Sequence, residues 1–273
     1  MGIINLYSDD VSLGGKVSDA LDVARGKVIS FLEDDDEFFP SKLSTVYAAF
    51  ENDIDYYHNS YLVRRSDGSH AVKCKQSLKS GEFIGVKDFA YSPISVNCSS
   101  ISIRKSILEA EKSRLKLVHI TNDHFYFMSA LLHGKHLICD PKILTVVREH
   151  GDRASLDASS FERFLKHRRW LAVSHYRDAL LLLEMSKGTP FEELARYDLV
   201  LSELDYHAMP TPREVVYDVP FPSLSDEIFW IANQRFADKP TSAVIGVARG
   251  LLPFLPRGTK LLFFKALFSL RRL

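Results

Sequence analysis

The sequence predicts an α/β fold with a mainly parallel sheet and flanking helices, followed by a mostly helical C-terminal region. Strand and helix patterns alternate up to about residue 150, which favours parallel strands joined by helices. After about residue 155 the pattern becomes long and helical. With 273 residues, of which 46% are apolar, the chain can bury a sizeable core. We therefore expect one domain over 1–155 and a helical region over 156–273.

Charge and cysteine content exclude several classes of protein. The 35 basic and 35 acidic residues balance, so no overall field favours a nucleic-acid partner. The cysteines, Cys74, Cys98 and Cys139, are too few and too scattered for a disulfide framework or a CxxC metal site. The sequence shows the pattern of neither a signal peptide nor a membrane span. We expect the chain in the cytoplasm. Any contact with a membrane would then be at its inner face.

The first predicted strand leads directly into an acidic segment. Apolar residues recur at helical spacing over 17–25, Gly26 marks a tight turn, and 27–32 is a β-branched and aromatic run. The residues that follow this strand are Glu33, Asp34, Asp35 and Asp36. In α/β sheets, ligands bind beyond the carboxyl ends of the strands. The acids are therefore expected where a ligand would bind.

The remaining elements follow from periodicity and turn residues. A helix is predicted over 41–53, with Ser41 as its N-cap and Leu43, Val46 and Phe50 on one apolar face. After it come a strand over 53–65, a turn over 66–69, a strand over 96–104, helices over 105–114 and 123–134, and two short strands around Asp140 and Pro141. In the C-terminal region, helices are predicted over 159–186, 189–207 and 225–237.

The acidic segment alone has two explanations. Adjacent carboxylates repel one another, so a folded protein leaves them in water or supplies a cation. A solvated loop is the first explanation, because acidic runs are common on surfaces. A metal site is the second, because the strand before the acids and the Phe-Phe-Pro sequence and helix after them hold the carboxylates at a sheet edge. Hard oxygen ligands at a fixed point suit magnesium or manganese bound to a diphosphate.

Around these acids the sequence resembles the inverting family 2 glycosyltransferases, which have the GT-A fold. That family shows a helix, an Ala-x-Gly turn, an apolar strand, an Asp-x-Asp-Asp metal motif, an aromatic residue, a proline and a Lys-Leu pair. Here the corresponding segment is ALDVARGKVISFLEDDDEFFPSKL. The resemblance implies a metal-dependent nucleotide-sugar transferase in which Asp35 binds Mn²⁺ or Mg²⁺ and Glu33 and Asp36 contact the nucleotide. Glu33 stands in place of the usual Asp.

Two further segments resemble the family in order and spacing. The family has a Glu-Asp pair at a helix start, a glycine eleven residues later, and a histidine after an arginine. Asn122-Asp123, Gly134, Arg148 and His150 correspond to them, with Asn122 in place of the Glu. The resemblance implies that Asp123 is the general base and that His150 approaches the metal. Taken alone, Asp123 is more simply a helix N-cap and His150 a loop histidine.

The resemblance also implies the substrates and an incomplete start. The donor would be a nucleotide-diphosphate sugar, the acceptor a hydroxyl of a sugar, a lipid-linked molecule or a protein, and the configuration would invert. Family members begin with two strands that hold the nucleotide base and ribose, whereas this chain opens on IINLYSDD. The GT-A-like domain is therefore expected to be N-terminally incomplete, with an unpaired sheet edge and little or no activity alone.

Residues 243–273 are expected to lie on a membrane surface. No acid follows Asp238, and the leucines and phenylalanines are interrupted by the basic residues Arg249, Arg257, Lys260, Lys265, Arg271 and Arg272. The charges break every apolar run before it could span a bilayer, which favours an interfacial segment. The alternative is a C-terminal helix pair packed on the protein itself.

Other candidate sites have ordinary structural explanations. Gly14-Gly15-Lys16 lacks the upstream Gly and the following Ser or Thr of a phosphate loop, so a plain turn is expected. His133 and His136 suit charge compensation at a helix end, and Ser99 and Ser100 lack nucleophile-elbow glycines. Two other functions stay open for the whole chain: a transferase-like scaffold that binds without turnover, and a peripheral membrane interaction module.

Overall fold

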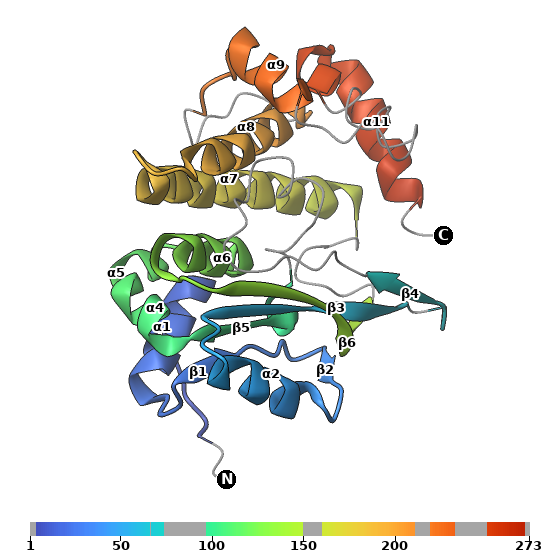
Figure 1. Cartoon of the computed structure of the whole chain (residues 1–273). Coiled ribbons are helices and arrows are strands. Elements are labelled where there is room, and N and C mark those ends of the chain that lie inside the picture. The colour runs from blue at the N-terminus through green and yellow to red at the C-terminus, as the bar shows by residue number, and fades with distance from the viewer. Residues whose placement is uncertain are drawn as a thin grey trace. The chain divides into compact units, whose positions relative to one another are not determined.

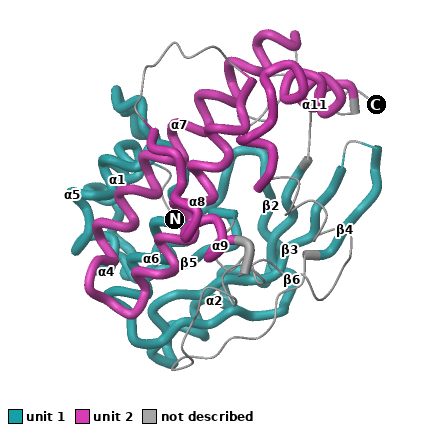
Figure 2. Tube along the Cα trace, turned by 90° about the horizontal axis from the view of Figure 1, so that it is seen from above, with its two compact units in different colours: residues 1–83, 92–149 teal, residues 84–91, 150–273 magenta. Residues whose placement is uncertain are grey.

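The computed structural model of the chain describes residues 4–65, 67–73, 97–149, 160–210, 219–232 and 250–270. The described residues up to Glu149 form one compact unit, called unit 1, and those from Ser160 onward form unit 2 (Figure 2). Unit 1 is α/β and unit 2 is helical (Figure 1). His150 and Cys74 lie outside the described residues.

Unit 1 alternates helices with strands, as the sequence predicts. Its elements are α1 (Leu13–Val23), β1 (Val28–Ser30), β2 (Glu37–Phe38), α2 (Lys42–Glu51), β3 (Tyr56–Arg65), β4 (His70–Lys73), the short 3-10 helix η1 (Cys98–Ser100), β5 (Ile101–Arg104), α4 (Lys105–Ala110), α5 (Lys112–Leu115), α6 (Asn122–His133) and β6 (Leu137–Glu149). The predicted strand over 96–104 is therefore helical before it becomes β5. The predicted helix over 105–114 breaks at Glu111 into α4 and α5.

The sheet is mixed, so the prediction of a mainly parallel sheet is wrong. Its strand order is β1-β5-β3-β6-β2, with β4 paired to β3. Both β1 and β3 run antiparallel to β5, which lies between them, and β3 runs parallel to β6. The helical connections do give β1, β3 and β6 a common direction, as helical crossovers require. The prediction failed because β5 inserts between two of these strands and because β2 and β4 add antiparallel pairs.

These directions bring three segments to one edge of the sheet. The carboxyl ends of β1 and β6 lie there, together with the start of the antiparallel β5. Residues 31–36 leave β1, at one end of the strand order, and enter β2, at the other end. The acidic segment therefore crosses the edge where β5 begins and β6 ends.

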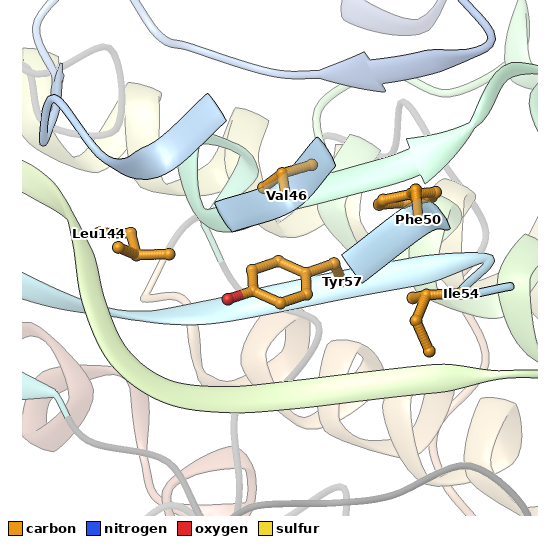
Figure 3. Close-up of a cluster of buried hydrophobic side chains, with 5 residues drawn as sticks. All are labelled: Val46, Phe50, Ile54, Tyr57 and Leu144. Carbon is orange, nitrogen blue, oxygen red and sulfur yellow. The ribbon is translucent and has the colours of Figure 1, made fainter. Parts of the chain in front are cut away.

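Helices cover both faces of the sheet (Figure 1). Successive side chains of a strand point to opposite faces. On β3, Tyr56 contacts Phe127 of α6, with ring centroids 5.7 Å apart, whereas Tyr57 packs against α2. Figure 3 shows the cluster on the α2 face, which consists of Val46, Phe50, Ile54, Tyr57 and Leu144. Each fully buried apolar side chain contributes about 1.5–3 kcal/mol, so this cluster fixes α2 on the sheet.

The buried face and the cap of α2 differ from the prediction. Val46 and Phe50 are buried as predicted, but Leu43 is 51% exposed, and Lys42 takes the third buried position, one turn before Val46. Ser41 makes no side-chain capping bond. The buried positions 42, 46 and 50 follow the spacing of one helix face. Lysine is seldom fully buried, so a sequence pattern of apolar residues favours Leu43 over Lys42 on this face.

Two glycines let α1 begin earlier than predicted. Gly14 and Gly15 are helical instead of forming a turn, and a Cβ on Gly14 would lie only 1.9 Å from a backbone carbonyl of α5. The N–H groups of Leu13 and Gly14 donate to carbonyls in 118–119, and the Ser12 hydroxyl accepts from Gly15. The donors at the start of α1 are thus already used, which argues against a phosphate site.

One long strand, β6, replaces the two short strands predicted around Asp140 and Pro141. Its register against β3 shifts between Asp140 and Ile143, so that Pro141 and Lys142 fall outside the ladder. Proline cannot donate to a ladder and is tolerated at such a bulge. The bulge therefore lets β6 continue to Glu149, beside the acidic segment.

Unit 2 consists of packed helices. Its elements are α7 (Phe161–Ser186), α8 (Glu192–Ala208), α9 (Leu224–Ala232), η2 (Leu252–Phe254) and α11 (Arg257–Leu270). The first three lie where helices were predicted. Trp230 of α9 is buried against Tyr197, Val200 and Leu204 of α8. Within the described ranges, no helix is long and apolar enough to cross a membrane.

Candidate functional site

The segment that leaves β1 is held firmly against unit 1. The Phe31 N–H donates to a carbonyl of β5 at 3.2 Å, and the Phe31 ring stacks on Tyr126 of α6 with centroids 4.1 Å apart. Two residues later the Glu33 N–H donates to the Ser99 hydroxyl at 2.9 Å. The Asp36 N–H closes a turn on the Glu33 carbonyl at 3.2 Å. The acids therefore follow a backbone that is fixed by neighbouring elements.

Glu33, Asp35 and Asp36 gather their carboxylates in this turn. One oxygen from each lies within 4.8 Å of the others. Oxygen ligands bind Mg²⁺ at about 2.1 Å and so stand at most about 4.2 Å apart, a spacing that a small side-chain movement achieves. Glu33 is exposed, Asp35 is partly buried and Asp36 is buried. This set of donors fits a hard divalent cation that solvent can reach from the Glu33 side.

The end of β6 reaches the same turn. Asp36 Oδ1 accepts a hydrogen bond from the Arg148 N–H at 3.1 Å. The Arg148 guanidinium pairs with Glu37, and Arg64 of β3 lies 3.7 Å from that carboxylate. Asp36, predicted to contact the nucleotide, thus also braces the end of β6. His150, predicted on the metal side, follows Arg148 by two residues and lies outside the described residues.

Asp123 occupies the first turn of α6, where its two carboxylate oxygens are both used. Oδ2 accepts from the Asn97 N–H at 2.9 Å, and Oδ1 accepts from the His124 N–H at 3.0 Å. The N-cap position belongs to Thr121, so the simpler explanation of Asp123 as the cap is wrong. Asn97 has φ 76°, a conformation that costs a non-glycine residue about 1–3 kcal/mol. In that conformation the Asn97 N–H donates its hydrogen bond to the Asp123 carboxylate.

One turn, formed by residues 97–100, joins the acids to Asp123. Asn97 donates to Asp123, and Ser99 accepts from Glu33. Between them, Cys98 has its thiol pKa raised well above the usual value, first by burial and then by the charges of Asp123 and Glu33. The structure therefore brings Asp123 and the acidic segment to the same turn, although they are far apart in sequence.

Asn122 makes a structural contact beside Asp123. It is 5% exposed, and its side chain hydrogen-bonds to Tyr126. Burial, followed by Cys98 and Asp123, raises the Tyr126 pKa well above the usual value in spite of that bond. The Tyr126 hydroxyl therefore keeps its proton.

The sequence does not indicate the roles of three residues of the site: Lys42, which enters only through the Lys-Leu pair of the resemblance, Asn97, and Ser99, which enters only as a rejected nucleophile. The sequence does contain a signal for the burial of Lys42. This residue lies one turn before Val46 and two turns before Phe50, so all three share one face of the helix. For Asn97 and Ser99 there was none. Their contacts run through a backbone N–H and a hydroxyl, and only the fold decides which side chains these groups meet.

The other candidates have structural partners. His133 Nε2 lies 2.7 Å from Glu111, and His136 Nδ1 lies 3.6 Å from Asp53. Ser100 is fully buried, as is Ser99. A surface groove of about 460 Å³ lies elsewhere in unit 1, lined by Ser44, Thr45, Ala48, Ala49, Asn52, Tyr57, Ile138, Asp140 and Lys142. None of the clustered acids contributes to it.

Comparisons with known proteins do not assign this chain to a family. A scan of protein-family models found no match, and a search of curated proteins found no similar sequence.

Proposed function

We propose that this chain is a glycosyltransferase that moves a sugar from a nucleotide-diphosphate donor to an acceptor hydroxyl with inversion. The observation that supports it best is the turn at 97–100, which holds Glu33 on one side and Asp123 on the other. The metal would bind the diphosphate that leaves the sugar carbon, and the base would deprotonate the hydroxyl that attacks the same carbon, so their residues have to share one edge of the fold.

The fold adds support at a coarser level. An α/β unit with three strands that run in one direction, and with acids beyond the end of the first of them, suits a GT-A-like domain. In this proposal the domain covers unit 1, and unit 2 is a separate helical region.

The acids would hold the metal and the nucleotide. Asp35 would bind Mn²⁺ or Mg²⁺ together with His150, and Glu33 and Asp36 would contact the bound nucleotide. When bound, the cation supplies positive charge to the departing diphosphate. The exposed Glu33 and the buried Asp36 would define the solvent side and the protein side of that position.

Asp123 would be the general base. It would take the proton of the acceptor hydroxyl while the new bond from the acceptor oxygen to the anomeric carbon forms and the bond to the nucleoside diphosphate breaks. The departing diphosphate carries away the electron pair of the broken bond. The hydrogen bonds from Asn97 and His124 hold the carboxylate in place.

Calorimetric titration of UDP and of GDP, with and without Mn²⁺, tests the proposal on the full chain. We expect one of the two to bind in a manner that needs Mn²⁺ and that Asp35→Asn abolishes. Asp34→Asn is the matched control, because Asp34 is the exposed neighbour outside the cluster. Absence of binding by both nucleotides in the presence of Mn²⁺ would contradict the proposal.

A transferase-like scaffold is the alternative from another class. It would show the same metal-dependent nucleotide binding but no release of nucleotide from any sugar donor. A chain that acts only as a peripheral membrane module would show neither property.

We also propose contact with a membrane surface through the C-terminal helix. In α11, Leu262 is 68% and Phe263 is 46% exposed, and the exposed Lys265 lies one turn after Leu262. Apolar residues beside a lysine suit the interface of an anionic bilayer. A lipid-linked acceptor would explain why a transferase has such a surface.

A further inference from the structure

Lys42 is a fully buried lysine at the first position of α2. A lysine is rarely buried without a partner, since taking a charged ammonium out of water is costly. The start of a helix makes the cost larger, because the helix dipole is positive there. An apolar side chain next to Val46 and Phe50 would pack without these costs. The contacts of the Lys42 ammonium should therefore explain its presence.

Those contacts are to neutral acceptors. Lys42 Nζ donates to Asn59 Oδ1 of β3 and, at 3.4 Å, to the carbonyl of Ser100. It also lies 5.2 Å from the centroid of the Phe38 ring. Burial lowers the pKa of Lys42 to about 7. An amine that has lost its proton still has two N–H donors, so both hydrogen bonds survive near neutral pH.

Asn59 extends the network to β6 and back to the same turn. Its Nδ2 donates to the Thr145 hydroxyl at 3.0 Å, and that hydroxyl donates to the Ser99 carbonyl at 3.0 Å. Asn59, Ser99, Ser100 and Thr145 are all fully buried. The carbonyls of two successive residues of the turn at 97–100 are thus held from one connected set of buried groups.

The opposite side of the turn faces the proposed site. The Ser99 hydroxyl, on the same residue whose carbonyl Thr145 holds, accepts from the Glu33 N–H. Asn97, at the start of the turn and in a strained conformation, donates to Asp123. Such a conformation persists only where its surroundings hold it.

We propose that Lys42 is a positioning residue that fixes the turn at 97–100 and, through this turn, the spacing between the acidic segment and Asp123. The inference rests on the proposed function, which it extends by naming a residue that touches neither metal nor substrate. The Lys42 ammonium, the Asn59 amide, the Thr145 hydroxyl and the carbonyls of Ser99 and Ser100 all have partners in this network. Displacing any one of these groups would leave buried polar groups unpaired, so the network favours one arrangement.

The test compares Lys42→Met with Glu111→Gln in the full chain. Methionine keeps the length of the side chain but cannot donate. Glu111 is also buried in unit 1, where it pairs with Arg114 and His133, but none of its contacts involves the turn. Both variants are expected to lower the melting temperature, so a general loss of stability is matched between them.

Two measurements separate the variants. Lys42→Met should weaken Mn²⁺ binding about 10- to 100-fold, the usual cost of losing a group that supports metal ligands, while Glu111→Gln leaves it unchanged. Hydrogen exchange of the Glu33 and Asn97 amides should become faster in Lys42→Met alone. Unchanged exchange at both amides would overturn the inference, whatever the metal result.

A double-mutant cycle with Ser99→Ala tests the route. If Lys42 acts through Ser99, the two substitutions together weaken Mn²⁺ binding by less than the product of their separate effects. Simple multiplication of the effects would overturn the route through Ser99. Thr145→Val is the substitute variant if Lys42→Met does not fold, because it removes the bond to the Ser99 carbonyl and keeps the side-chain shape. In this variant too, exchange of the Glu33 and Asn97 amides is expected to become faster.

The outcome for the wild-type chain separates this inference from the proposed function. Failure of the wild type to bind Mn²⁺ would contradict the metal site but would leave the exchange experiment valid. Wild-type Mn²⁺ binding with no effect of Lys42→Met on binding or exchange would overturn only the role of Lys42.

Discussion

Phe31 and Tyr126 are stacked, with ring centroids 4.1 Å apart and planes 6° from parallel. Phe31 is the first residue after β1, and Tyr126 lies in α6 one turn after Asp123. The stack therefore ties the start of the acidic segment to the helix that carries the proposed base. Aromatic pairs of this kind contribute about 0.5–1.5 kcal/mol beyond the burial of their surface.

Replacement of Phe31 by Leu should remove the stack and retain most of the apolar contact. We expect the free energy of unfolding of unit 1 to fall by about 0.5–1.5 kcal/mol. Both tryptophans, Trp170 and Trp230, are in unit 2, so hydrogen exchange of amides in unit 1 is needed to follow this unit. Phe39→Leu is the control, since Phe39 is 36% exposed. Equal effects of the two variants would contradict a special role of the stack.

Replacement of Asp123 by Asn should remove turnover without unfolding the site. The amide oxygen of asparagine can still accept from the Asn97 N–H, so the turn should keep its place and Mn²⁺-dependent nucleotide binding should persist. Loss of a general base lowers rates about 10²- to 10⁴-fold. Release of UDP or GDP from nucleotide sugars measures this loss. If nucleotide binding falls as much as turnover, Asp123 is a structural residue.

Much of the fold could be predicted because its signals are local. The helices over 123–134 and 159–186 have apolar residues at helical spacing, and both are present as α6 and α7. Strand pairing is not a local property. Nothing in the segment 101–104 indicates that it inserts between β1 and β3, and this insertion makes the sheet mixed. Sequence periodicity gives the direction of a strand after a helical crossover, but not its neighbours.

The candidate site likewise has one part that the sequence predicts and one part that only the fold reveals. The acids after β1 could be predicted from the strand that delivers them. The turn that connects them to Asp123 could not, because its contacts use the Asn97 N–H, the Ser99 hydroxyl and two carbonyls. The N–H and the two carbonyls are backbone groups, which residue type does not reveal, and the Ser99 hydroxyl gives no sign in the sequence that it meets Glu33. The burial of Lys42 could not be predicted from residue type for the opposite reason, since a lysine ordinarily indicates a solvated surface.

Unit 2 should show a pH-dependent stability that originates at Glu203. This residue of α8 is 7% exposed, and burial, with a smaller contribution from Asp226, raises its pKa to about 7. Between its ordinary pKa of 4.5 and about 7, the folded state therefore holds a proton that the unfolded state has released. Stability falls as pH rises through this window, because the unfolded state binds fewer protons.

Glu203→Gln should abolish that fall. We expect the variant to match the wild type near pH 4.5 and to be more stable by about 1–3 kcal/mol at pH 8. Urea unfolding followed by tryptophan fluorescence measures it, because Trp230 packs against α8. Glu193→Gln, at an exposed position of the same helix, should give no pH-dependent difference. A constant gap between Glu203→Gln and the wild type at all pH values would contradict the prediction.

The last prediction concerns α11, whose two sides differ. One side is packed: Phe264 is 2% exposed in a cluster with Phe164 of α7, and the Lys260 ammonium donates to the carbonyls of His207 and Pro253. The alternative of a helix packed on the protein thus describes this side. Of the basic residues expected at the membrane surface, Lys260 instead donates to carbonyls of unit 2, and Arg249, Arg271 and Arg272 lie outside the described residues.

The other side carries the exposed Leu262 and Lys265, which are one turn apart, and Phe263 is exposed next to Leu262. Serine at both positions 262 and 263 should weaken sedimentation of the full chain with phosphatidylglycerol vesicles by about tenfold or more, since each large side chain that enters the interface contributes about 1 kcal/mol or more. Leu224→Ser is the control, because Leu224 is 74% exposed on α9, outside the proposed surface. Added salt should weaken wild-type binding, since the Lys265 charge is screened. Equal sedimentation of the wild type and the double variant would mean that this side of α11 is an ordinary solvated surface.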